Sequence, residues 1–151
     1  MKEYKTVDQI EIKTNPETIW SFFQNLERNY LDWHRQDHIV LKWIKGKPHT
    51  EGSIVYAEEY ILGKRVKIKM KCVEIIENQK IRYKTLFPLS LFHPGSEYTF
   101  ENTDAGVLFT ATNYFRIPCV IRNHIMKLIK ATEVHIKEEA INLKRILEEK
   151  D

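Results

Sequence analysis

Residues 119–149 read CVIRNHIMKLIKATEVHIKEEAINLKRILEE, a stretch without glycine or proline. Its side chains recur at spacings of three and four residues, the period of one face of an α-helix. The residues on that face are Ile121, Ile125, Leu128, Thr132, His135, Glu139, Leu143 and Ile146. This pattern predicts one long amphipathic helix, which needs another large element to cover its apolar face.

The chain before this helix follows the two-residue period of β-strands. The alternation is clearest at 65–72, where Val66, Ile68, Met70 and Cys72 alternate with charged residues, mostly lysines. Strands are expected at 4–13, 39–45, 53–62, 65–72, 81–86, 96–102 and 107–116. Most neighbouring strands are separated by short turns, so antiparallel pairing is expected.

Two short helices are expected between the first and second strands. Asn15-Pro16-Glu17 begins one, because Asn caps a helix, Pro fits its first position and Glu suits its positive end. The second covers roughly 26–36. We therefore predict an α+β protein of the helix-grip kind. One domain, 1–151, would form a curved antiparallel sheet of about seven strands around the long C-terminal helix, enclosing a cavity.

Composition narrows the class of protein. The 151 residues are 42% hydrophobic and 30% charged, as in ordinary globular domains, and the formal net charge of +3 is too small to favour nucleic acid binding. Cys72 and Cys119 form no close pair, and no apolar run approaches a membrane span. The N-terminus has no apolar segment typical of a signal peptide, so a cytoplasmic location is expected.

Polar residues occupy several positions where apolar ones are expected. His135 and Glu139 interrupt the helix face four residues apart, so both can reach one metal ion. Glu59 shares a strand face with aliphatic residues, and a carboxylate there must be paired, protonated or bound to metal. If a bulge turns Glu59 outward, Glu58 takes its place.

The segment His34-Arg35-Gln36-Asp37-His38 offers a third contribution to the same cavity. His38 is the preferred candidate because it begins a strand, and His34 is the alternative. Asp37 or Asp32 would orient the chosen imidazole. Two imidazoles and two carboxylates suit zinc, and less selectively manganese, iron or nickel.

Other side chains are candidates for contact with a substrate. Tyr30 and Tyr114 can donate hydrogen bonds, and Arg116 can bind an anionic group. His93, in a loop flanked by prolines, is a candidate for the cavity entrance.

The order of elements, with Asn15-Pro16-Glu17-Thr18-Ile19-Trp20 opening the first helix, resembles the SRPBCC superfamily. That group includes START lipid-transfer domains, the birch-pollen allergen fold and polyketide cyclases. The resemblance covers essentially the whole chain. Because its motifs are loose, it implies the fold more strongly than any activity.

A narrower resemblance links the chain to the diacetylphloroglucinol and phloretin hydrolases. It is carried by residues 33–39, by 56–59 before Gly63, and by 135–139 followed by Asn142-Leu143-Lys144. Those helix-grip enzymes bind zinc through two histidines and two glutamates. The resemblance implies four ligands here, His38, Glu59, His135 and Glu139, with Tyr30 matching a tyrosine that precedes the first histidine. This chain is much shorter than those enzymes.

Three functions follow as hypotheses. The first is a zinc-dependent hydrolase that cleaves a carbon–carbon bond beside a ketone of a small hydrophobic or aromatic substrate. The second is a non-catalytic carrier of a lipid or aromatic metabolite, and the third a metal-free cyclase or dehydratase with His135 or Glu59 as the base. In each case the expected partner is a small hydrophobic or aromatic ligand, and self-association as a homodimer stays open.

Overall fold

The computed structural model describes residues 1–149 and has the predicted order of elements. The elements are β1 (Lys2–Ile12), α1 (Pro16–Gln24), α2 (Leu26–Trp33), β2 (His38–Lys45), β3 (Ile54–Ile61), β4 (Lys64–Ile76), β5 (Lys80–Thr85), η1 (Leu89–Leu91), β6 (Gly95–Thr103), β7 (Gly106–Ile117), η2 (Cys119–Ile121) and α3 (Arg122–Glu149). The predicted helix-grip architecture, with two short helices after the first strand, is confirmed.

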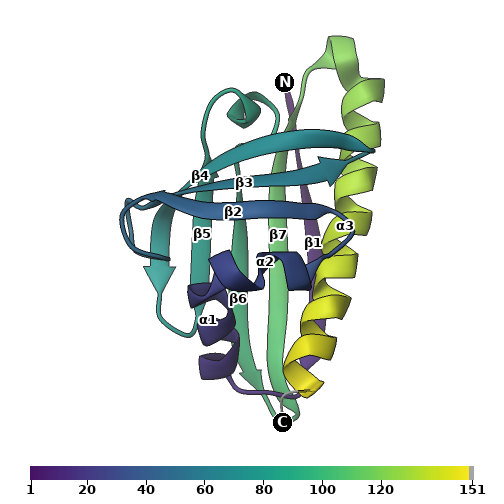
Figure 1. Ribbon diagram of the computed structural model, residues 1–151. Helices are drawn as coiled ribbons and strands as arrows, with labels where there is room; N and C mark the ends of the chain where they lie inside the picture. Colours follow the sequence, from purple (N-terminus) through teal and green to yellow (C-terminus); the bar gives the residue numbers. More distant parts are fainter. Residues whose placement is uncertain (150–151) are drawn as a thin grey trace.

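The strands form one antiparallel sheet in the order β1-β7-β6-β5-β4-β3-β2. In Figure 1, β2 and β3 lie across the view while β6 and β7 run from top to bottom, so the sheet is strongly curved. The long helix α3 follows one side of the curved sheet, and α1 and α2 cover its lower end (Figure 1). The connection through α1 and α2 carries the chain from one edge of the sheet to the other.

The two short helices begin and end for local reasons. The Asn15 side chain accepts a hydrogen bond from the backbone N–H of Thr18 at 2.9 Å, and Pro16 occupies the first turn of α1. The second helix ends at Trp33, earlier than predicted, because His34 leaves helical geometry with φ −151° and ψ 84°. This early end frees the following residues to form the polar segment that reaches α3.

The buried face of α3 is rotated slightly from the predicted one. Ile121 lies in η2, just before α3, and is 40% exposed. Leu128 is also 40% exposed, but it still lines the cavity between α3 and the sheet. The buried residues of α3 are Ile125, Ile129, His135, Ile136, Glu139, Ala140, Leu143 and Leu147. The curved sheet contacts a band of α3 that is wider than one row of residues at spacings of three and four. Side chains next to the predicted row are therefore buried as well.

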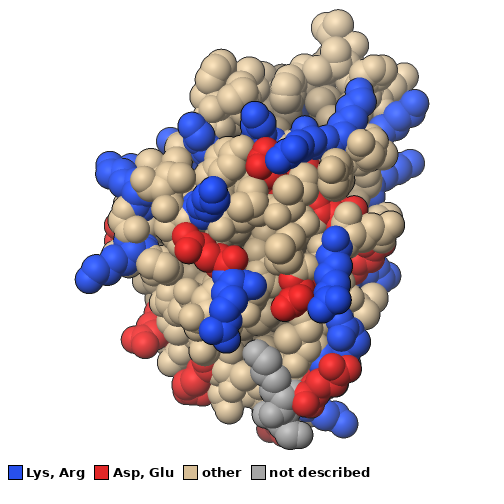
Figure 2. Space-filling model, viewed as in Figure 1, with Lys and Arg blue, Asp and Glu red and all other residues tan. Residues whose placement is uncertain are grey.

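The surface carries charges of both signs. Figure 2 shows basic and acidic side chains interspersed on the visible face, while the upper end of this view is mostly uncharged. No helix within residues 1–149 has an apolar stretch long enough to cross a bilayer.

Candidate metal centre in an apolar cavity

A cavity of about 210 Å³ lies between α3 and the inner face of the sheet. Its walls are mainly aliphatic and aromatic side chains from α2, most of the strands and α3. Among the described residues, no lysine or arginine lines it. Such a cavity suits a neutral, largely apolar small molecule held by a few polar groups.

Two histidines and two glutamates meet beside this cavity, and three of them, Glu59, His135 and Glu139, line its wall. His38 begins β2, Glu59 lies on β3, and His135 and Glu139 project from adjacent turns of α3. His38 pairs with Glu59 across the β2–β3 ladder, and the register shifts directly after His38. In a regular strand, His38 and Leu41 would lie on opposite faces of the sheet because they are three residues apart. The register shift interrupts the alternation of side chains, so both residues face the same side.

The atoms that could bind a metal ion lie close together. The two Nε2 atoms of His38 and His135 are 3.3 Å apart. Carboxylate oxygens of Glu139 lie 3.3 Å from each Nε2. Tetrahedral zinc bonds of 2.0–2.1 Å place neighbouring ligand atoms about 3.4 Å apart, so this triad has suitable spacing for an ion. Among residues 1–149, His38, His135 and Glu139 form one compact group of potential ligands.

Glu59 lies beside the same pair of imidazoles at a slightly greater distance. Its Oε2 is 3.8 Å from His38 Nε2 and 3.6 Å from His135 Nε2. The phenol of Tyr30 donates a hydrogen bond to this oxygen at 2.8 Å. Glu59 can therefore serve as a fourth ligand, or receive support from Tyr30 while three residues hold the ion.

Hydrogen bonds on the outer side fix both histidine tautomers. His38 Nδ1 is 2.7 Å from the backbone oxygen of Tyr30, and His135 Nδ1 is 3.0 Å from Asp37 Oδ2. These oxygens only accept, so Nδ1 carries the proton in each ring. In the neutral rings both Nε2 lone pairs then point toward each other and toward the Glu139 carboxylate. A positive charge, either a proton or a metal ion, must occupy this centre.

The pKa values agree with that requirement. Burial disfavours the charged form of His135, but Glu139, Glu59 and the hydrogen bond with Asp37 outweigh it, so the pKa of His135 is raised. Burial raises the pKa of Glu59, and the opposing effects of His135 and His38 do not cancel it. Without a metal ion, the cluster therefore tends to retain protons.

The position of the cluster is held by α2. The Trp33 indole donates to the backbone oxygen of Glu139 at 2.9 Å, and the Asn142 amide donates to the Trp33 oxygen at 3.0 Å. The Tyr30 ring stacks on the His38 ring, with centroids 3.8 Å apart and planes 4° from parallel. The two hydrogen bonds hold α3 against α2 at the position of Glu139, and the stacking fixes the plane of the His38 ring.

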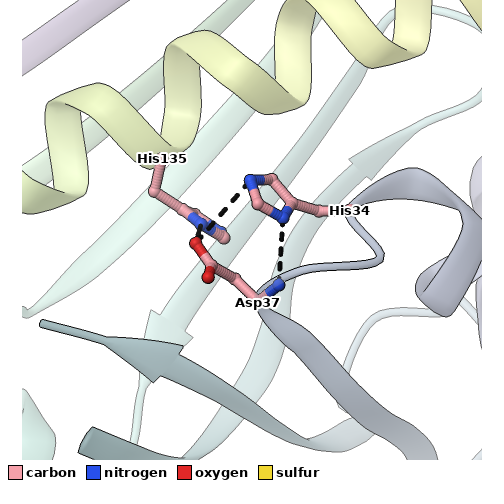
Figure 3. A group of neighbouring side chains, drawn as sticks. All are labelled: His34, Asp37 and His135. Atoms are coloured by element: carbon pink, nitrogen blue, oxygen red, sulfur yellow. Dashed lines mark hydrogen bonds and ion pairs between the residues drawn. The ribbon is translucent and has the colours of Figure 1, made fainter. Parts of the chain in front are cut away.

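The alternative histidine, His34, belongs to a supporting network (Figure 3). His34 and Asp37 approach His135 from the segment between α2 and β2 (Figure 3). The His34 and His135 rings stack with centroids 4.6 Å apart, and Asp37 lies beside both rings. His34, Asp37 and His135 also form a compact group of potential ligand atoms. However, His34 Nδ1 accepts from the Asp37 backbone N–H at 3.1 Å, and Nε2 lies 2.7 Å from Glu138. The lone pair of His34 Nδ1 is used in this hydrogen bond and is not free for a metal ion. His34 therefore orients Asp37, and Asp37 in turn orients His135.

Three other candidates face away from the cluster. Glu58, the alternative to Glu59, accepts two hydrogen bonds from Arg65 at 3.0 and 3.1 Å on the opposite face of β3. Tyr114 and Arg116 are exposed on the outer face of β7, whereas their neighbours Asn113 and Phe115 face the cavity. Tyr114 and Arg116 therefore do not line this cavity, and their contact with a substrate stays a prediction. The two-residue period of β7 is the reason that they face outward.

His93 does line the cavity, as part of a second polar group. Its ring lies 2.9 Å from Thr85 Oγ1 and 3.0 Å from Asn113 Oδ1. Burial lowers the pKa of His93, and the hydrogen bond with Asn113 offsets this only in part. The ring is therefore neutral near pH 7.

Sequence reasoning missed Tyr98, which lines the cavity from β6. Its pKa is raised well above the ordinary value, first by burial and then by the negative charges of Glu139 and Glu59. Its hydroxyl therefore stays protonated and can donate a hydrogen bond. Ser96, Tyr98 and Phe100 are alternate residues of β6 and therefore share one face of the strand, and this alternation could have identified Tyr98 from the sequence.

Comparisons with solved structures bear on the fold. Solved structures of similar fold include norcoclaurine synthase from Thalictrum flavum in complex with dopamine and hydroxybenzaldehyde, at 11% identity and TM-score 0.73, covering 99% of this chain and 89% of that one. TTHA0849 from Thermus thermophilus gives 14% identity and TM-score 0.73, with 97% of each chain covered. A major latex-like protein from Panax ginseng gives 15% identity and TM-score 0.63, covering 88% and 97%.

These neighbours are helix-grip proteins of the SRPBCC kind, and the similarity establishes the fold of this chain. No family model and no curated protein matches the sequence. At such low identity the neighbours define the architecture alone, while activity has to be argued from the residues of the site.

Proposed function

We propose that this protein is a zinc-dependent hydrolase that cleaves a carbon–carbon bond beside a ketone of a small aromatic or cyclic substrate. The observation that carries the proposal is the convergence of His38, His135 and Glu139, with Glu59 beside them, in an apolar cavity. Two nitrogen and up to two oxygen ligands suit zinc. Because the unprotonated nitrogens and the carboxylates face one another, the site is suited to a cation.

The residues present fit zinc, and His38, His135, Glu139 and Glu59 would hold it. When bound, the ion would supply Lewis-acid polarisation of a substrate carbonyl and lower the pKa of a coordinated water. Hydrolysis adds the hydroxyl of water to the acyl carbon, breaks the bond to the neighbouring carbon and delivers a proton to that carbon. The products are a carboxylic acid and the shortened carbon skeleton.

The side chains around the centre have distinct roles in this proposal. Tyr98 donates a hydrogen bond to a substrate oxygen, because its phenol stays protonated and lines the cavity. Tyr30 holds Glu59 through its 2.8 Å hydrogen bond and can pass a proton along that contact. The apolar walls exclude bulk water and favour a substrate with an aromatic or aliphatic body.

Metal content tests the proposal directly. The purified protein is expected to contain about one zinc ion per chain by mass spectrometry, and His135→Ala is expected to lose it. His124→Ala is the matched control, because His124 is an exposed histidine on the same helix. Unchanged zinc stoichiometry in His135→Ala would refute the metal site.

Activity is tested separately with acetyldimedone, a small cyclic triketone. The zinc-loaded protein is expected to release acetate, and a chelator is expected to stop the release. A zinc-loaded protein that releases no acetate from this probe argues against this chemistry. Acetate release that persists after complete removal of metal would instead support an acid–base mechanism.

A carrier of hydrophobic molecules is the second candidate function. The apolar walls favour it, and norcoclaurine synthase, which shares the fold, was solved with two small aromatic molecules. Carriage alone does not require unprotonated imidazoles directed at carboxylates. A metal-free protein that co-purifies with a stoichiometric lipid or aromatic compound would favour this function.

A further inference from the structure

A second polar group, Thr85–His93–Asn113, lies in the part of the cavity toward the start of α3. The His93 ring packs against Phe115, with centroids 5.2 Å apart, and Phe115 shares an apolar cluster with Ile125 and Ile129. Ile125 and Ile129 precede His135 by ten and six residues, which is about 15 and 9 Å along a helix. The second polar group is therefore separated from the histidine–glutamate cluster by an apolar stretch of cavity.

The hydrogen bonds of this group have a defined direction. With the Asn113 oxygen facing His93 at 3.0 Å, His93 Nε2 must carry the proton and donate. His93 Nδ1 then accepts from the Thr85 hydroxyl at 2.9 Å. Thr85 and Asn113 are only 1% and 5% exposed, so this arrangement is shielded from solvent.

One donor of the group has no protein partner. Asn113 Nδ2 is buried and makes no hydrogen bond with any described residue of the chain. Buried amide groups nearly always have a partner, and Asn113 lines the cavity. A ligand in the cavity is the natural source of the missing acceptor.

We propose that Asn113 is a second ligand anchor, whose amide donates a hydrogen bond to a neutral oxygen of the substrate such as a ketone, ester or ether oxygen. The inference rests on the proposed function, since it concerns a ligand whose reactive ketone lies at the His38–His135–Glu139 end. It narrows the substrate class to molecules with two oxygen functions at opposite ends of an apolar body.

The charge of the surroundings excludes an anionic group at this end. No lysine or arginine among residues 1–149 lines the cavity, and His93 is neutral because burial lowers its pKa. A carboxylate or phosphate here would lose its hydration without a compensating positive charge. A neutral acceptor needs only the single amide donor that Asn113 offers.

Binding of two matched probes tests the proposal. The first is para,para′-diacetylbiphenyl, with a carbonyl at each end of a rigid apolar body, and the second is para-acetylbiphenyl, which lacks one carbonyl. The wild-type protein is expected to bind the diacetyl probe roughly five- to tenfold more tightly, measured by calorimetry. Asn113→Leu is expected to reduce this preference to less than about twofold, with zinc content unchanged.

Two further variants keep the test decisive. Thr112→Val alters the neighbouring side chain of β7 on the opposite face and is expected to keep the wild-type preference. Asn113→Asp replaces the amide donor with an acceptor and is expected to weaken binding of the diacetyl probe, even if Asn113→Leu fails to fold. Folding of each variant is checked by circular dichroism.

The outcomes separate this proposal from the proposed function. A preference for the diacetyl probe that survives in Asn113→Leu or Asn113→Asp overturns the second anchor, as does a wild-type protein that binds both probes equally or binds neither. If the preference depends on Asn113 but the protein holds no zinc, the anchor stands and the hydrolase proposal fails.

Discussion

Replacing Asp37 with asparagine would test how the cluster is held. Asp37 Oδ2 accepts a hydrogen bond from His135 Nδ1 at 3.0 Å and thereby keeps the opposite nitrogen of the ring unprotonated. A hydrogen bond to a charged group contributes about 1.5–3 kcal/mol and a neutral one about 0.5–1.5 kcal/mol. The carboxylate is 27% exposed, so solvent screens part of the difference.

A loss of about 1–2 kcal/mol corresponds to zinc affinity roughly 5- to 30-fold weaker in Asp37→Asn. The assay is a competition titration against a chromophoric zinc chelator at constant pH. Asp32→Asn is the matched control, because Asp32 is a nearby carboxylate that is 67% exposed and pairs only with Arg35 on the surface. Equal affinity in Asp37→Asn and the wild type, or an equal loss in Asp32→Asn, would refute the reasoning.

Three further predictions follow. Burial lowers the pKa of His49 from 6.5 to about 4, so its neutral form stabilises the fold above pH 6.5, and this contribution is lost as the pH falls toward 4. Between pH 7 and pH 5 the free energy of unfolding of the wild type is expected to fall by about 2 kcal/mol because of this group, as measured by urea denaturation. The variant His49→Asn is expected to lack this loss, and asparagine tolerates the positive φ of 46° at this position. Tyr98→Phe is expected to lower kcat for acetyldimedone about tenfold or more without changing zinc content, and an unchanged kcat would remove Tyr98 from the mechanism. Gly106→Ala is expected to destabilise the protein by roughly 2 kcal/mol or more, since its Cβ would press on the Ile12 carbonyl oxygen that borders the β1–β7 ladder, and an unaltered melting temperature would contradict this.

Much of the fold was predictable because its signals are local. The helical period of residues 119–149 and the alternation at 65–72 depend on side chains within one turn or one strand. The same locality placed His135 and Glu139 on one face of α3, four residues apart. The partial exposure of Ile121 and Leu128 was not predicted, because the extent to which the sheet covers the start of α3 depends on strands distant in sequence.

The candidate site was only partly predictable for the same reason. A register shift after His38 aims that residue inward, and no periodic pattern reveals such a shift. Asp37 was expected to orient His34 or His38, but its carboxylate orients His135, a residue 98 positions away. Tyr114 and Arg116 were assigned to the cavity by residue type, whereas the pleat of β7 turns them outward.

The sequence by itself determined the class of fold and the side chains able to bind an ion. Helix and strand periods are properties of neighbouring residues, and two imidazoles with two carboxylates define a donor set before folding. Only the tertiary structure decided which of them meet. The curved sheet brings β2 and β3 against α3. Hydrogen bonds that the two histidines donate to the Tyr30 backbone oxygen and the Asp37 carboxylate direct both Nε2 atoms to one point. Such contacts depend on register and curvature over the whole chain, which no local pattern of residues encodes.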